Sequence, residues 1–242
     1  MKILHLFNDL MNLYGDGGNI DYLQWILKDR FGFQDISILR QSIGDELALE
    51  EADFIYCGAG SESNRLLALE YLRPYQQRLK KLILEDQKVV LFTGNSWTML
   101  GQKIETDQGS FEGLHVFDFV TKENEQKRRV TDAVYTCLID GNPVVGFINK
   151  VSVLVQVPFP LFRVETGSAN TLSGLTEGLA VKNCFGTFLI GPILVKNPPF
   201  LKMILKRLFP DLVFVLTDEF ILDEEALAGY EITLSELKKK YQ

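Results

Sequence analysis

Two short segments of the chain have the residue types and spacing expected at an enzyme active site. The apolar run 89–92 stops at Thr93-Gly94-Asn95-Ser96, which predicts a strand, a sharp turn and the start of a helix. Enzymes of the α/β class present a nucleophile at such a turn. The second segment, Gly58-Ala59-Gly60-Ser61, follows another apolar run and would lie at the same edge of a parallel sheet.

Few side chains in the chain could act as a nucleophile or a base. The cysteines Cys57, Cys137 and Cys184 are widely spaced and make neither a disulfide framework nor a CxxC pair. Cys57 ends a predicted strand and is the candidate for a relocated nucleophile, although a buried structural cysteine is the simpler interpretation. The histidines are His5 and His115. No metal-ligand spacing is present, so we expect no metal and no cofactor.

Hydroxyl and carboxyl groups also surround the predicted turn. Thr93 and Ser96 flank its tip, but either hydroxyl would need a base to become a nucleophile. Asp16 and Glu62 could act as acids in a cleft. For Asp16, capping of its own glycine-rich loop at 9–19 is the simpler interpretation.

The first half of the chain alternates between predicted strands and helices. Strands are expected at 2–7, 36–40, 52–57 and 89–92, and helices at 20–29, 46–51 and 62–86, with Asn19 as the first N-cap and Pro74 interrupting the third helix. This order favours a mostly parallel sheet with helices on both faces. Function is then expected at the carboxyl ends of the strands, in the loops 9–19, 58–64 and 93–97.

The second half has a different pattern. Short strands joined by turns are expected at 117–121, 131–138, 143–149 and 151–157, and a longer apolar strand at 187–194. The charged segment 122–129 is interpreted as a solvated hairpin or loop. Helices are expected at 198–208 and 223–241. Because no linker or repeat is visible, we expect a single α/β domain over 1–242, with the short strands of the second half antiparallel.

Composition excludes some partners. The net charge is -7 and no basic stripe is present, so nucleic acid is not an expected partner. No apolar stretch approaches the roughly 18–20 residues that cross a bilayer. The N-terminal segment lacks the apolar region and cleavage site of a signal peptide. We therefore expect a cytoplasmic protein with no membrane span.

Four stretches together resemble class I glutamine amidotransferase domains of the cobyric acid synthase-type branch. Within that branch the resemblance is greatest to the glutaminase subunits of bacterial lipid II isoglutaminyl synthases. The stretches are DLMNLYGDGGNI (9–20), YCGAGSE (56–62), FTGNSWTMLG (92–101) and GTFLIGPILVKNP (186–198). The resemblance covers nearly the whole chain and implies a flavodoxin-like fold.

The resemblance also implies which positions carry the reaction. In active members a cysteine at the turn attacks the glutamine side-chain amide, a late histidine is base and acid, and backbone amides of the 56–62 loop stabilise the oxyanion. Matched to the family motif from its closing Gly101, the nucleophile position of this chain is Gly94. The histidine position is Ile190, and a second family histidine falls on Lys150. Glycine cannot attack a carbonyl carbon, and isoleucine cannot accept a proton.

We therefore expect an amidotransferase-like domain without thioester glutaminase activity. In the resembling family the glutaminase supplies ammonia to a Mur-ligase-type synthetase, so this chain is expected to act as a partner or regulatory subunit of such an enzyme in cell-wall precursor amidation. One alternative is a module that binds a small amide or carboxylate in a cleft built from the residues Gly58, Ala59, Gly60, Asn95, Ser96 and Gly191. Another is an active enzyme with a relocated nucleophile.

Overall fold

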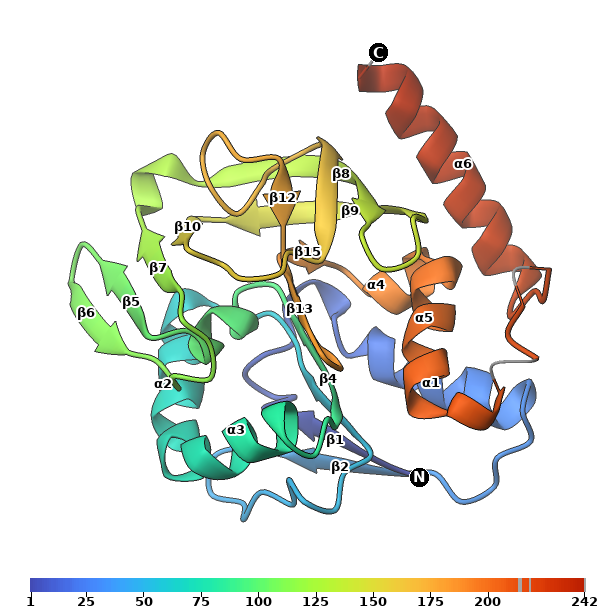
Figure 1. Cartoon of the computed structure of the whole chain (residues 1–242), viewed down its shortest axis with the longest axis horizontal. Helices are drawn as coiled ribbons and strands as arrows, with labels where there is room; N and C mark the ends of the chain where they lie inside the picture. The colour runs from blue at the N-terminus through green and yellow to red at the C-terminus, as the bar shows by residue number, and fades with distance from the viewer. Residues whose placement is uncertain (213–214, 218, 242) are drawn as a thin grey trace.

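A six-stranded sheet forms the centre of the protein in the computed structural model, which describes residues 1–212, 215–217 and 219–241 (Figure 1). The strands run in the order β13 (Leu179–Val181), β14 (Cys184–Thr187), β4 (Val89–Thr93), β3 (Phe54–Cys57), β1 (Lys2–Leu6) and β2 (Ser37–Gln41). All neighbouring pairs are parallel except the edge pair β13–β14. The predicted mostly parallel sheet is therefore confirmed.

Helices cover both faces of this sheet. β3, β4 and β14 are buried along their whole lengths, which explains why their sequences are continuous apolar runs and do not alternate. Helices α2 (Glu62–Leu72) and α3 (Gln76–Leu84) lie on one face, and α1 (Gly18–Asp29) and α5 (Pro198–Leu208) lie on the other (Figure 1). The crossovers from β1 and β3 run in opposite directions, so the ends of these strands form a switch point where ligands bind in such folds.

Two smaller sheets are built mainly from the second half of the chain. One has the order β10 (Ser152–Val155), β7 (Val120–Glu123), β5 (Lys103–Thr106) and β6 (Gly109–Glu112). The other has the order β12 (Thr176–Glu177), β11 (Phe162–Thr166), β8 (Arg129–Cys137), β9 (Pro143–Lys150) and β15 (Leu189–Ile190), and all its pairs are antiparallel. One apolar core cluster contains residues from all three sheets.

Short helices connect these elements. They are η1 (Leu13–Gly15), η2 (Arg73–Tyr75), η3 (Ser96–Leu100), η4 (Glu125–Lys127), α4 (Ile193–Lys196) and η5 (Pro210–Leu212). The chain ends in α6 (Glu224–Tyr241), a long helix that packs against β8 and β9 (Figure 1). Within the described residues, no helix is long and apolar enough to cross a membrane.

The helix expected at 46–51 is wrong. Its backbone is held by the side chain of Gln41, whose amide donates to the carbonyl of Glu46 and accepts from the N–H of Ala48. Leu47 and Leu49 are both buried, a spacing of two residues that suits extended chain and not a helix. Here side-chain to backbone hydrogen bonds from one glutamine, a few residues earlier in the chain, replace those of a helix.

Two further expectations are corrected by the structure. Asn19 is not an N-cap: α1 begins at Gly18, and the buried Asn19 amide donates to the carbonyl of Asp16 and to the hydroxyl of Tyr56. The strand expected at 187–194 is divided into β14, β15 and α4. Gly191 has a φ of +70°, so the chain turns there before α4 begins.

Candidate active site

The predicted turn at the end of β4 is present. Gly94 has a φ of +62°, a left-handed conformation that glycine adopts without strain, and η3 begins two residues later at Ser96. The helix that follows the turn is η3, which is of the 3₁₀ type and ends at Leu100. The turn lies beside the loop after β3, and a small pocket of about 100 Å³ opens between them, lined by Ala59, Gly60, Gly94, Asn95 and Ile190 among others. The structure thus brings the expected nucleophile and base positions together.

A side chain at position 94 would have no room in this pocket. A Cβ built on Gly94 collides with the Cβ of Ala59 and lies 3.0 Å from its Cα. The same Cβ lies 3.1 Å from Cγ2 of Ile190. Real Cβ atoms are not found as close to another carbon as this one would be to Ala59. Ala59 therefore fills the space into which a nucleophile would project.

The backbone amides of the loop after β3 already have acceptors within the protein. The N–H of Ala59 donates to Oδ2 of Asp16 at 2.9 Å. The N–H of Gly60 donates to Oδ1 of Asn95 at 3.1 Å, and Nδ2 of Asn95 donates back to the carbonyl of Gly60 at 2.9 Å. Two of the amides expected to bind an oxyanion or a ligand are thus engaged by side chains.

Asp16 is fully buried and joins three segments of the site. Besides the N–H of Ala59, its carboxylate accepts the hydroxyl of Thr93 at 2.8 Å and the N–H of Gly191 at 2.8 Å. Burial raises the pKa of Asp16, and these donors oppose that rise. Sequence reasoning expected a loop cap, and it missed the contacts with the β3, β4 and β15 loops because they lie far away along the chain.

Among the described residues, Cys57, Cys184 and Ser96 have no base as a hydrogen-bond partner, whereas the hydroxyl of Thr93 donates to the carboxylate of Asp16. The Cys57 and Cys184 thiols are fully buried, and burial raises the pKa of each well above its usual range. The hydroxyl of Ser96 donates to the carbonyl of Thr93 at 2.7 Å. His5 is buried within β1 with its ring against Tyr56, and neither of its ring nitrogens has a hydrogen-bond partner among the described residues.

Other candidate groups lie outside the site. His115 is exposed, and its Nε2 lies 3.0 Å from Oε2 of Glu112. The Cys137 thiol is buried in β8, and burial raises its pKa to about 11. Among the described residues, no cluster of three or more His, Cys, Asp or Glu side chains could hold a metal ion.

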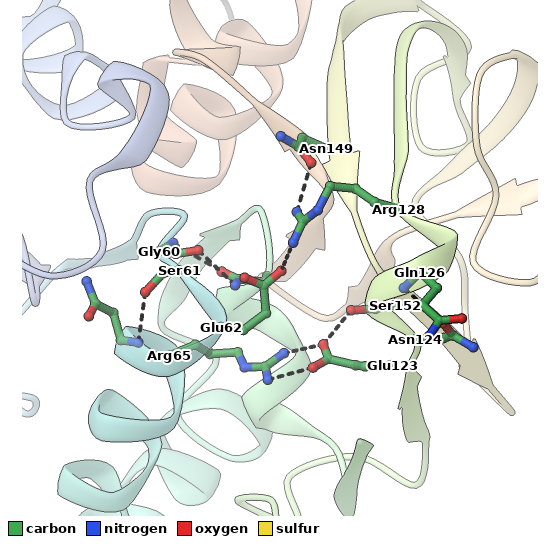
Figure 2. A network of polar contacts seen from close by, with 12 residues as sticks. Gly60, Ser61, Glu62, Arg65, Glu123, Asn124, Gln126, Arg128, Asn149 and Ser152 are labelled. Carbon is green, nitrogen blue, oxygen red and sulfur yellow. Dashed lines mark hydrogen bonds and ion pairs between the residues drawn. The ribbon is translucent and has the colours of Figure 1, made fainter. Parts of the chain in front are cut away.

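Polar side chains line the mouth of the pocket (Figure 2). The guanidinium of Arg128 donates to Oδ1 of Asn149 at 2.9 Å and to Oε1 of Glu62 at 2.9 Å. Nδ2 of Asn149 in turn donates to the hydroxyl of Tyr14 at 2.7 Å. Sequence reasoning named Glu62 but missed Arg128, because nothing in the run KENEQKRR distinguishes this arginine from its neighbours.

The segment 122–129 is not simply a solvated loop, as the sequence suggested. Its Glu123 is buried and forms a bidentate ion pair with Arg65 of α2, with oxygen–nitrogen distances of 2.5 and 2.9 Å (Figure 2). Ser152 adds a hydrogen bond of 2.7 Å to the same carboxylate. This buried pair fixes β7 against α2 and so places the following Arg128 over the pocket.

Lys150, which the sequence resemblance matches to a second family histidine, is buried and held by contacts within the protein. Its buried ammonium donates to the carbonyl of Ala169 at 2.5 Å and lies 4.3 Å from the ring centroid of Phe188. Burial lowers the pKa of Lys150 to about 8, while the nearby Glu177 carboxylate opposes that shift. These contacts tie β9 to the loop before β12.

Comparison with known proteins agrees with this geometry. The model of the CobB/CobQ-like glutamine amidotransferase domain matches residues 2–198. The chain is 33% identical over 198 residues to the GatD subunit of the glutamine-hydrolysing lipid II isoglutaminyl synthase of Staphylococcus aureus, covering 81% of this chain and 79% of the relative. It is 28% identical over 200 residues to the same subunit of Streptococcus pneumoniae, covering 81% and 76%.

The fold itself is found in solved structures of distant relatives. A glutamine amidotransferase from Thermotoga maritima superposes with a TM-score of 0.54 at 10% identity, covering 98% of this chain and 94% of the other. The strand order, the turn at Gly94 and the matched segment all point to the same conclusion. The chain belongs to the CobB/CobQ-like glutamine amidotransferase family.

Proposed function

We propose that this protein is a partner or regulatory subunit of a Mur-ligase-type synthetase in cell-wall precursor amidation and does not hydrolyse glutamine through a thioester. The first part rests on its similarity to two proteins named as subunits of lipid II isoglutaminyl synthase. The second part rests chiefly on one observation, the collision between a Cβ at Gly94 and the Cβ of Ala59.

The thioester route needs groups that these positions do not supply. A thiolate must add to the side-chain carbonyl carbon of glutamine, and a protonated base must deliver a proton to the departing ammonia. Water then cleaves the thioester and regenerates the thiol. Gly94 has no side chain, and the buried Ile190 has no titratable group. Loss of either member of a nucleophile–base pair removes many kcal/mol of transition-state stabilisation.

The surrounding residues support the same proposal. An active site of this class must leave backbone amides free to meet the oxyanion of the tetrahedral intermediate. Here the N–H groups of Ala59 and Gly60 donate to Asp16 and Asn95. The Asn95 carboxamide would have to leave Gly60 before a substrate oxygen could take its place. The fold is retained while the reactive centre is filled by the protein's own side chains.

The decisive experiment measures ammonia release from glutamine by the purified chain, alone and together with any synthetase that co-purifies from the native cell. The Staphylococcus aureus relative, which is named glutamine-hydrolysing, serves as the positive control. We expect no ammonia above background from the chain alone and recovery of a synthetase-like partner. Glutamine-dependent ammonia from the chain alone would refute the catalytic part, and recovery of no synthetase would refute the partner part.

A second candidate function is binding of a small amide or carboxylate ligand at the pocket mouth. The observation in its favour is the polar group formed by Arg128, Glu62 and Asn149, which offers both a cation and an anion at the pocket (Figure 2). Thermal-shift measurements with glutamine, glutamate and cell-wall precursors test it. A rise in melting temperature that is lost in Arg128→Gln supports the binding function. An unchanged melting temperature with all of these ligands rejects it.

An active enzyme with a relocated nucleophile is the remaining alternative, and Cys57 is its candidate residue. The thiol of Cys57 is fully buried, and its raised pKa keeps it protonated at neutral pH. Among the described residues, the Cys57 thiol has no basic side chain as a hydrogen-bond partner, and it donates to the carbonyl of Gly58 at 3.9 Å. A cytoplasmic location stays a prediction from the sequence.

A further inference from the structure

A second cavity lies away from the turn at Gly94, between α5, the β8–β9 turn and the start of α6. Its volume is about 550 Å³, within the range of roughly 300–1,000 Å³ that is typical of small-molecule sites. Most of its lining residues follow residue 198, so this cavity is built largely by chain beyond the segment that the family model matches. In Figure 1 the two helices that flank it, α5 and α6, lie at the C-terminal side of the molecule.

Apolar side chains form one part of the cavity wall. Met203 on α5 and Leu222 before α6 are both buried and line the cavity. Leu227, on the first turn of α6, is half-buried beside them. Met203 and Leu222 belong to the main core cluster, and Leu227 packs against a second cluster formed by Val134, Val145 and Tyr230.

Cations form another part of the wall. Lys202, Lys206 and Arg207 all line the cavity from α5. Lys202 donates to the carbonyl of Thr217 at 3.0 Å. Among the residues that the structure describes, the side chains of Lys206 and Arg207 make no hydrogen bond or ion pair. Two positive charges therefore line the cavity with no side-chain partner in the described part of the chain, whose full sequence has a net charge of -7.

Two carboxylates, Asp140 and Asp223, also line the cavity, so three cations and two anions leave its wall with a formal charge of +1. Oδ1 of Asp140 accepts the N–H of Asn142 at 3.0 Å within the β8–β9 turn. Oδ1 of Asp223 accepts the N–H of Ala226 at 3.1 Å at the start of α6, and its Oδ2 accepts the hydroxyl of Tyr22 at 2.8 Å. Each acidic group thus has a structural partner of its own.

We propose that this cavity binds an organic anion. The charged head, a phosphate or a carboxylate, lies between Lys206 and Arg207, and the apolar body lies against Met203, Leu222 and Leu227. A guanidinium and an ammonium that line the same cavity suit such a head because charge-assisted hydrogen bonds are stronger than neutral ones. The proposal is independent of the proposed function, because it concerns a different cavity.

A matched pair of fluorescent probes tests this site on the full chain. 8-Anilinonaphthalene-1-sulfonate carries an anionic group on an apolar body, and N-phenyl-1-naphthylamine has the same rings without the charge. We expect the sulfonate probe to bind with a stoichiometry of about one and its affinity to fall about tenfold in Lys206→Gln/Arg207→Gln. Binding of the neutral probe should stay within about twofold. The variant Lys28→Gln/Lys127→Gln removes the same amount of charge elsewhere on the chain and should leave the affinity for both probes unchanged.

Competition identifies the head group. Octyl phosphate or octanoate should displace the sulfonate probe, whereas inorganic phosphate and the uncharged octyl glucoside should not. Stronger displacement by octyl phosphate assigns a phosphate head, and stronger displacement by octanoate assigns a carboxylate. The proposal is overturned if the sulfonate probe does not bind, or if the double variant lowers the affinity for this probe less than about fivefold. It is also overturned if the double variant lowers the affinities for the two probes equally. Arg207→Gln alone, at an exposed position, provides the same comparison in a less altered protein.

Discussion

The methyl group of Ala59 occupies the space into which any side chain at Gly94 would extend. The two residues belong to the loops that follow β3 and β4, and these neighbouring strands pair in parallel from Phe54–Val89 to Cys57–Phe92. The contact therefore follows from the sheet itself and not from a movable surface loop. It makes the amidotransferase turn and a reactive side chain at its tip mutually exclusive in this conformation.

Gly94→Ala is expected to lower the free energy of unfolding by about 2 kcal/mol or more, because the new Cβ both collides with Ala59 and takes a positive φ. Combining it with Ala59→Gly should recover about 1 kcal/mol relative to additivity. Denaturant unfolding measures both changes. Gly141→Ala is the matched control, since its φ is +76° and a Cβ there meets nothing within 4 Å. Equal losses at both glycines would contradict the collision.

Removing one member of the buried Arg65–Glu123 pair should be costly. Glu123→Gln is expected to lower the free energy of unfolding by about 3 kcal/mol, because Arg65 would keep an uncompensated buried charge. The double variant Arg65→Met/Glu123→Leu should lose less stability than Glu123→Gln, because it leaves no unpaired buried charge. Denaturant unfolding provides the measurement. Arg163→Met, which breaks an exposed pair with Glu165, should change stability by less than about 1 kcal/mol, and a comparable loss there would contradict the argument.

Asp16→Asn tests whether one carboxylate joins the loops of the site. Either orientation of the new amide places an NH₂ group against an N–H donor, that of Ala59 or that of Gly191. We expect a loss of about 2 kcal/mol in stability and faster hydrogen exchange at both amides. Asp21→Asn alters an exposed ion pair with Arg40 and should leave that exchange unchanged. Unchanged exchange in Asp16→Asn would show that the loops hold together without this carboxylate.

His5 should make the protein less stable in acid. Burial, aided by the charge of Arg40, lowers the pKa of His5 to about 4, so the folded protein keeps it neutral while the unfolded chain binds a proton below about 6.5. Above pH 6.5 the difference between these two pKa values therefore costs no stability. As the pH falls from 6.5 towards 4, protonation of His5 in the unfolded chain lowers the free energy of unfolding, by about 3 kcal/mol at most.

His5→Phe keeps an aromatic ring against Tyr56, which now lies 5.2 Å from the imidazole centroid, and removes two nitrogens that have no partner among the described residues. Unfolding measured between pH 7 and 4 should show a shallower loss of stability in this variant than in the parent chain. The exposed His115→Gln serves as the control and should keep the parent slope. If the curves of stability against pH are parallel for the parent and His5→Phe, His5 is not the source of the loss of stability in acid.

Local sequence patterns were sufficient for the framework of the fold. Continuous apolar runs predicted β3 and β4 because both faces of the sheet are covered, and the boundaries of α5 at Pro198–Leu208 followed from its proline start and apolar period. The tip at Gly94 was found from the break between an apolar run and a polar turn. These features depend on neighbours in sequence, so a sequence can reveal them.

The contacts that fill the site could not be found in this way. Asp16 meets Gly191 across 175 positions of the chain, and Arg65 meets Glu123 across 58. Neither pairing leaves a periodic signal, and charges such as Glu123 are on average exposed. Pairings of this kind emerge only once the strands are placed. The mistaken helix at 46–51 has a different cause, because there the side-chain amide of the nearby Gln41 holds the backbone in place of helical hydrogen bonds.

The most direct test of the central claim is covalent trapping. The purified chain is treated with a glutamine-analogue electrophile such as 6-diazo-5-oxo-norleucine, and its intact mass is measured. We predict no adduct, because position 94 carries no nucleophile and the thiol of Cys57 is buried with a raised pKa. A single stoichiometric adduct that disappears in Cys57→Ser would contradict the account and show that the nucleophile has been relocated.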